Sequence, residues 1–172
     1  MPTYKEELTR AMSWLGQQPD TLFIGQNIIY GGNAMYSTFE GVPSEKKIEL
    51  PVMENAQLGM SIGMALMGKI VVSIFPRMDF LLCATDMLVN HLDKGLYKGS
   101  GKVIIRVGVG STKPMHPGLQ HCGDYTEGLE KILQRVAITR LLHRLNIMPA
   151  YLGAYAGNYS SLLVEYGDNY GQ

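Results

Sequence analysis

The stretch Pro-Val-Met-Glu-Asn-Ala-Gln-Leu-Gly-Met-Ser-Ile-Gly-Met-Ala-Leu-Met-Gly, residues 51–68, decides the fold of this chain. Pro51 limits the residue before it to extended geometry, and Val52 and Met53 are expected to end a strand or its turn. From residue 55 the pattern predicts a helix that is apolar on every side, and such a helix is normally buried. Glu54, at its start, is the only charged residue of the stretch.

Two glycines of this helix, Gly59 and Gly63, lie four residues apart and therefore share a face. A glycine inside a helix costs about 1 kcal/mol relative to alanine, so the pair predicts the close approach of another backbone. Glu54 has two interpretations that the stretch leaves open. It is either a helix-start charge, worth about 0.3–1 kcal/mol through the helix dipole, or a chemical group.

The whole chain has 172 residues, which predicts one domain with a sizeable core. Lys and Arg number 15, as do Asp and Glu, so no net field attracts nucleic acid or an anionic membrane. The two cysteines, Cys83 and Cys122, form neither a metal spacing nor a disulfide framework. The N-terminus lacks the features of a signal peptide, and no apolar run is long enough to span a bilayer. We therefore expect a cytoplasmic protein.

Periodicity predicts alternating helices and strands along the chain. Helices are expected at residues 3–16 (with Thr3 as N-cap and Glu6 in capping-box position), at 55–68, at 80–92 and at 127–145. Strands are expected at residues 21–24, 48–52, 69–75, 103–107, 148–152 and 161–165. This order predicts an α/β fold with three layers, in which a mostly parallel sheet carries helices on both faces. Ligands bind such sheets beyond the carboxyl ends of the strands, so we expect four segments to share one rim: 25–36, Glu54, 76–80 and 108–123.

The sequence resembles the pyrimidine-binding domain of thiamine-diphosphate enzymes. The resemblance is strongest to the β subunit of 2-oxoacid dehydrogenase E1 components and more distant to transketolases. The resemblance extends from Tyr4 to about Glu165, and four groups of residues carry it, in order. They are Pro51, Glu54, Gly59, Gly63, Ala65 and Gly68; the upstream runs 22–27 and 30–32; Ala84-Thr85-Asp86 with Asn90; and the run Gly118-Leu119-Gln120-His121-Cys122.

The resemblance assigns roles to individual residues. It implies that the Glu54 carboxylate bonds N1′ of the cofactor's pyrimidine, which favours the imino form that removes the proton from C2 of the thiazolium. It implies that Phe80 lies beside the pyrimidine ring and that Val52 and Pro76 line the same pocket. His121 matches a loop histidine near the thiazolium that handles protons or the acyl acceptor. His116, a few residues away, is the alternative for this role.

Two departures from the family pattern define what this chain is expected to lack. Its usual acidic pair after the first strand is replaced by Gln26-Asn27. The Gly-Asp-Gly motif that holds the diphosphate and Mg²⁺ is missing: Asp124 follows Gly123, but Tyr125 comes next. Residues 1–172 are thus expected to be a single pyrimidine-binding domain without metal ligands. The Mg²⁺ of thiamine diphosphate is expected on a diphosphate-binding, E1 α-like partner chain.

The function expected from the resemblance is that of the pyrimidine-binding subunit of a split thiamine-diphosphate enzyme. Its reaction is either 2-oxoacid decarboxylation with acyl transfer or ketol transfer, and its assembly is an α₂β₂-like hetero-oligomer in which this chain also dimerises. A non-catalytic homologue that keeps the fold for assembly or regulation is the main alternative. A plain α/β small-molecule binder is a further alternative. Substrate contacts are spread over both halves of such a site, so the sequence does not select the 2-oxoacid or ketose.

Overall fold

A computed structural model describes residues 1–95, 101–113 and 116–172 of the chain. Its sheet has six strands in the order β2-β1-β3-β4-β6-β5, and every neighbouring pair is parallel. The strands are β1 (Thr21–Gly25), β2 (Lys47–Glu49), β3 (Ile70–Phe75), β4 (Lys102–Val109), β5 (Ala137–Leu141) and β6 (Ser161–Tyr166). The expected parallel α/β architecture is therefore confirmed.

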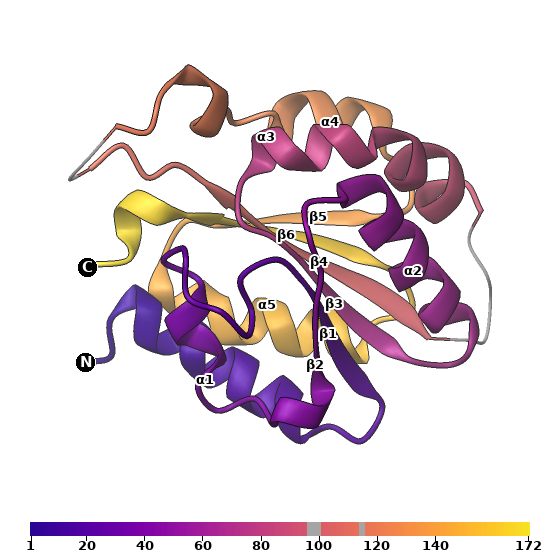
Figure 1. Ribbon diagram of the computed structural model, residues 1–172, viewed down its shortest axis with the longest axis horizontal. Coiled ribbons are helices and arrows are strands. Elements are labelled where there is room, and N and C mark those ends of the chain that lie inside the picture. Colours follow the sequence, from indigo (N-terminus) through magenta and orange to yellow (C-terminus); the bar gives the residue numbers. More distant parts are fainter. Residues whose placement is uncertain (96–100, 114–115) are drawn as a thin grey trace.

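Helices cover both faces of this sheet (Figure 1). One face carries α1 (Tyr4–Gln17) and α5 (Arg144–Ala156), and the other carries α2 (Glu54–Leu66), α3 (Met78–Leu81) and α4 (Thr126–Ile132). Successive side chains of a strand point to opposite faces. Accordingly Ile104 is buried in the core under α1 and α5, whereas its neighbours Val103 and Ile105 are buried under α2 to α4. The three layers thus enclose two hydrophobic cores.

Local sequence signals predict several elements within one or two residues. The α1 helix begins at the expected capping box: the Glu6 amide donates to Thr3 Oγ1 at 3.2 Å, and the Thr3 amide donates to Glu6 Oε2 at 2.7 Å. Strands β1, β3 and β6 match their predicted ranges closely, whereas β2 is shorter than predicted.

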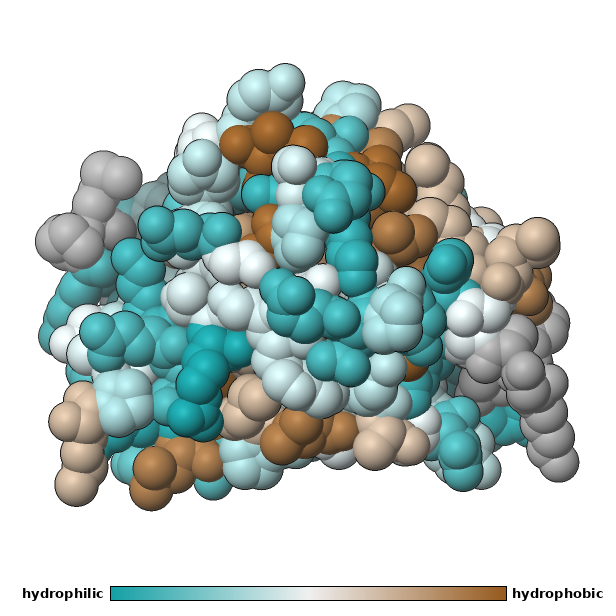
Figure 2. Space-filling model, turned by 90° about the horizontal axis from the view of Figure 1, so that it is seen from below, coloured by the Kyte–Doolittle hydropathy of each residue, from teal (hydrophilic) through white to brown (hydrophobic). Residues whose placement is uncertain are grey.

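Seen from below in Figure 2, the centre of the molecular surface is mostly hydrophilic or neutral, with separate hydrophobic groups nearer its edges.

The predicted helix at 127–145 is correct over residues 127–132 and wrong beyond them. The chain forms α4, a turn and the edge strand β5 there. The cause lies in Asp93, whose carboxylate accepts hydrogen bonds from the backbone amides of Gln134, Arg135 and Val136 at 2.7–3.1 Å. Burial alone would raise the pKa of Asp93, but these amide donors hold that pKa below its ordinary value. A side chain distant in sequence thereby ends the helix and starts the strand.

The predicted strand at 148–152 is also wrong, because these residues lie inside α5. Pro149 disfavours a helix interior since it lacks an N–H and its ring meets the preceding turn. Tertiary packing outweighs this cost: Ile147, Tyr151 and Ala154 are buried against the core that α1 shares. The predicted helix at 80–92 is helical but broken, with α3 followed by η3 (Leu82–Ala84) and the π-helix η4 (Met87–Asp93).

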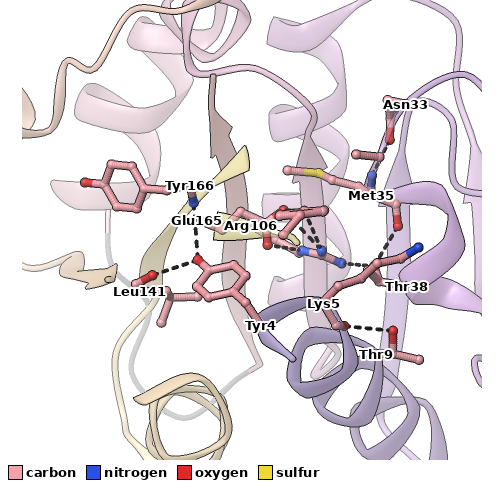
Figure 3. Close-up of polar contacts among 12 residues, drawn as sticks. Tyr4, Lys5, Thr9, Asn33, Met35, Thr38, Arg106, Leu141, Glu165 and Tyr166 are labelled. Carbon is pink, nitrogen blue, oxygen red and sulfur yellow. Dashed lines mark hydrogen bonds and ion pairs between the residues drawn. The ribbon is translucent and has the colours of Figure 1, made fainter. Parts of the chain in front are cut away.

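A buried ion pair joins the middle of the sheet to the rim at the carboxyl ends of the strands (Figure 3). Arg106 in β4 donates to both carboxylate oxygens of Glu165 in β6, at 2.9 and 3.1 Å, and both side chains are 0% exposed. Arg106 also donates to Thr38 Oγ1 at 2.7 Å, and the Tyr170 hydroxyl donates to Glu165. Burial favours the neutral form of Arg106, but the Glu165 carboxylate outweighs it and raises the pKa of the guanidinium above its ordinary value.

Candidate functional site

Glu54 begins α2 at the rim where the carboxyl ends of the strands lie, and it is 8% exposed. Gln26, which directly follows β1, donates through Nε2 to Glu54 Oε1 at 3.2 Å. Within the described part of the chain no hydrogen bond reaches Oε2, and this atom is not among the fully buried unpartnered ones. One carboxylate oxygen is thus held in place, while the other is open to an incoming N–H donor.

Gln26-Asn27, which stand where the resembled family has an acidic pair, hold the loop around Glu54. A carboxylate at position 26 would repel Glu54, whereas the Gln26 amide donates to it. The next residues are anchored by Glu49 at the end of β2, whose carboxylate accepts the backbone amides of Asn27, Ile28 and Ile29 at 2.6–2.8 Å. Asn27 has φ 56°, a left-handed conformation that Asn tolerates better than most residues. The loop after β1 is therefore fixed around Glu54.

Phe80 and His121, two residues predicted for the site, lie together. Their rings meet edge to face with centroids 5.5 Å apart and an interplanar angle of 82°. Arg77 Nη1 donates to the backbone carbonyl of His121 at 3.0 Å and thereby joins the segment after β3, which carries Phe80, to the segment after β4, which carries His121. Nδ1 of His121 is buried and has no hydrogen-bond partner among the described residues. In contrast, Nδ1 of the exposed His116 accepts the Gly118 amide at 3.0 Å, which favours His121 as the available imidazole.

Pro76 lines a cavity at the rim, whereas Val52 is exposed. This cavity has a volume of ≈ 60 Å³ and is also lined by Arg77. The side chain of Val52 is 78% exposed and that of Met53 is 39% exposed. Leu58 is fully buried below them. Within the described part of the chain, the outer side of the surroundings of Glu54 is therefore open.

The expectation that α2 is buried on every side is wrong for this chain by itself. Exposed apolar side chains line its outer side, and we call this surface the α2 face: Val52, Met53, Met60, Leu66 and Met67. A Cβ on Gly63 would meet no atom within 4 Å, and one on Gly59 would meet only Met87 Sδ, at 3.5 Å. Within the described residues, no other backbone approaches the glycine pair. Asn90 in η4 donates to Asp86, the residue before η4, at 2.8 Å.

A second cavity, of ≈ 270 Å³, is larger but lies beside β2, between Ile28, Phe39, Glu40 and Lys47. None of the residues predicted for the site lines it, so we place the candidate site at Glu54, Phe80 and His121. In the described ranges, no three His, Cys, Asp or Glu side chains converge as a metal site would require. Across those same ranges, no helix combines the length and apolar character needed to cross a membrane.

Comparison with known proteins gives structural matches only. No family model and no curated protein sequence matches the chain. Among solved structures, a split-gene transketolase described as an inactive β4 tetramer is similar with a TM-score of 0.74 and 15% identity, over 96% of this chain and 51% of that one. A putative thiamin diphosphate-dependent enzyme from Mycobacterium smegmatis is similar with a TM-score of 0.68 and 17% identity, over 99% of this chain and 32% of the other.

Benzoylformate decarboxylase from Polynucleobacter necessarius matches equally well, with a TM-score of 0.68 and 17% identity over 99% of this chain and 31% of that one. At these identities the likeness establishes the fold, and this is the fold expected from the pyrimidine-binding domain. The chain spans about half of the transketolase chain and about a third of the other two.

Proposed function

We propose that this chain is the pyrimidine-binding component of a two-chain thiamine-diphosphate-dependent enzyme. The observation that carries this proposal is the Glu54 carboxylate. It is nearly buried at the start of α2, with one oxygen held by Gln26 and the other open. Such a carboxylate fits an aminopyrimidine, which offers an N–H at protonated N1′. The similarity to thiamine-diphosphate enzymes supports the same assignment at the level of the fold.

When bound, thiamine diphosphate supplies the nucleophilic carbon that attacks the carbonyl group of a 2-oxoacid or ketose. Glu54 would accept the hydrogen bond from N1′ and hold the proton there, with Gln26 keeping the carboxylate in position. Phe80 would pack against the pyrimidine ring, with Pro76 and Val52 completing its pocket. His121 would move protons beside the substrate, because its Nδ1 has no hydrogen-bond partner among the described residues. The diphosphate and its Mg²⁺ would be held by an E1 α-like partner chain.

The α2 face supports dimerisation of this chain. A second copy would cover the exposed Met60, Leu66 and Met67, and its backbone could approach closely at Gly63, where no atom of this chain interferes. It would also close the open wall beside Val52 and Glu54. The transketolase neighbour, described as a β4 tetramer, shows that a chain of this fold can assemble with its own copies.

Met60→Asp is expected to dissociate this dimer, because a charge on the α2 face would be buried without a partner. The measurement is sedimentation equilibrium of the purified chain, in which the variant should weaken self-association by about 100-fold or more. Glu127→Lys, a comparably exposed change on α4, serves as the control and should leave the assembly unchanged. A wild-type chain that is monomeric at micromolar concentration would contradict the proposed interface.

Reconstitution tests the function itself. The chain is combined with candidate diphosphate-binding chains, and consumption of 2-oxoacids and of ketose phosphates is followed with and without thiamine diphosphate and Mg²⁺. We expect turnover only in the combined, cofactor-loaded sample, and His121→Ala should lower that turnover while leaving cofactor affinity nearly intact. An assembled, cofactor-loaded complex that is inactive on both substrate classes would favour the non-catalytic alternative instead.

A further inference from the structure

The cavity of ≈ 60 Å³ at the rim is bounded by the loop after β1 (Asn33), the loop after β3 (Arg77), the end of β4 (Ser111) and the end of β6 (Glu165). It contains none of the residues assigned above except Pro76. Four segments of the rim thus converge on a space of the size of a small polar group. Its lining combines apolar side chains with a few polar groups, and the hydrogen bonds that these polar groups already make decide what it can bind.

Two acceptors that line the cavity, the Glu165 carboxylate and the Gly110 carbonyl, already have donors. Glu165 lines it, but Arg106 donates to both of its carboxylate oxygens (Figure 3). The Tyr170 hydroxyl donates to Glu165 as well. The Gly110 carbonyl accepts Arg77 Nη1 at 2.5 Å. The Glu165 charge is balanced by Arg106 directly below it, so the pair contributes no net charge to the cavity.

The donors, in contrast, are still available. Arg77 uses only Nη1, for the carbonyls of Gly110 and His121, and it forms no ion pair with any described residue. Asn33 Oδ1 accepts the amides of Met35 and Tyr36 at 2.9 and 3.1 Å, which fixes the orientation of its side-chain amide. Its Nδ2 is consequently left buried and without a partner in the described part of the chain. The cavity is therefore lined by an arginine that has no ion-pair partner among the described residues and by an asparagine with an unused N–H, a combination that suits an anion.

We propose that this cavity binds a carboxylate group of the substrate, and specifically one that the substrate keeps through the reaction. The anion site follows from the donors, and its assignment to the substrate rests on the proposed function. Arg77 bonds the carbonyl of His121, so the cavity adjoins the residue expected beside the reacting carbon. A cation that gripped the carboxylate lost as CO₂ would stabilise the ground state more than the transition state, in which that charge disperses. A retained carboxylate gains binding without this cost, so the substrate class is a 2-oxoacid with a second acidic group.

Titration of the ¹⁵N-labelled chain, followed by NMR, tests the site with succinate as an unreactive dicarboxylate. Succinate should shift the amide resonances of residues 33–35 and 108–111 saturably, with a dissociation constant of about 1–10 mM, as befits a small ligand held by a few charge-assisted bonds. Arg77→Gln removes the charge, and Asn33→Asp keeps the oxygen that Met35 and Tyr36 need while removing the free donor. Each should weaken binding by about tenfold or more.

Arg140→Gln is the matched control. Arg140 lies on the edge strand β5, is partly exposed and pairs with Glu130 of α4. Its replacement should leave succinate binding unchanged. No saturable shift at the cavity, or equal weakening by the control, would overturn the anion site. Inorganic phosphate binding tenfold more tightly than succinate would overturn the carboxylate assignment in favour of a sugar phosphate.

A parallel titration with thiamine reports on the Glu54 pocket and separates the two proposals. A thiamine response without succinate binding would leave the proposed function standing and overturn this inference. Succinate binding in a reconstituted, cofactor-loaded complex that shows no preference for dicarboxylic 2-oxoacids over monocarboxylic ones would overturn the assignment of the cavity to the substrate.

Discussion

Replacement of Glu54 by Gln should lower turnover of the reconstituted enzyme by about 10²–10⁴-fold, the range typical for the loss of an acid–base group. The substitution keeps the size of the side chain and the hydrogen bond from Gln26 to its oxygen. What it removes is the negative charge that would hold a proton at N1′ of the cofactor. The fold should be preserved, because Glu54 contacts Gln26 and no other side chain through a hydrogen bond in the described ranges.

Glu127→Gln is the control for this experiment. Glu127 is likewise an acid in the first turn of a helix, α4, but it is exposed and is not among the residues assigned to the site. Any effect that comes only from the helix dipole should appear equally in both variants, at no more than about 1 kcal/mol. Near-normal turnover of the Glu54→Gln enzyme, with cofactor bound, would exclude Glu54 as the N1′ partner.

Arg106→Met should destabilise the folded chain by about 3–5 kcal/mol, since removal of one partner leaves the buried Glu165 carboxylate uncompensated. For a chain of this length, such a loss corresponds to a decrease of roughly 6–20 °C in Tm. The measurement is chemical denaturation of the purified chain, followed by circular dichroism.

Two further variants serve as controls for that result. Arg140→Met breaks the more exposed pair with Glu130 and should cost no more than about 1 kcal/mol. Arg106→Met combined with Glu165→Leu should recover part of the loss, because it removes both buried charges together. A loss below about 1 kcal/mol for Arg106→Met alone would contradict the view that this ion pair holds β4 and β6 together beneath the rim.

The elements that the sequence predicts well are those decided by neighbouring residues. The capping box of Thr3 and Glu6 starts α1, and the unbroken apolar run of β3 identifies a central strand. The elements it predicts wrongly are decided at long range. Asp93 ends α4 through amides more than 40 residues away, a contact that no local periodicity reveals. Likewise, the packing of Tyr151 keeps Pro149 inside a helix.

The candidate site divides in the same way. Motif spacing places Glu54 at a helix start. Phe80 and His121 lie together because each belongs to a segment that follows a strand of one parallel sheet. The residues that hold and complete the site carried no local signal. Arg106 lies within an apolar strand, and the donors of Arg77 and Asn33 become apparent only once their existing bonds are known. The surface beside Val52 is likewise left open by the described residues. The role of Val52 in the cofactor pocket stays a prediction.

Calorimetric titration with thiamine diphosphate and Mg²⁺ tests the central claim most directly, namely that this chain holds only the pyrimidine end of the cofactor. One carboxylate and a few apolar contacts can bind a fragment of that size only weakly, whereas the diphosphate and its metal ligands form the stronger hold. The chain by itself should therefore bind with a millimolar dissociation constant that is insensitive to Mg²⁺, and addition of the diphosphate-binding chain should strengthen binding by about 100-fold or more. Micromolar, Mg²⁺-dependent binding by this chain alone would contradict the claim.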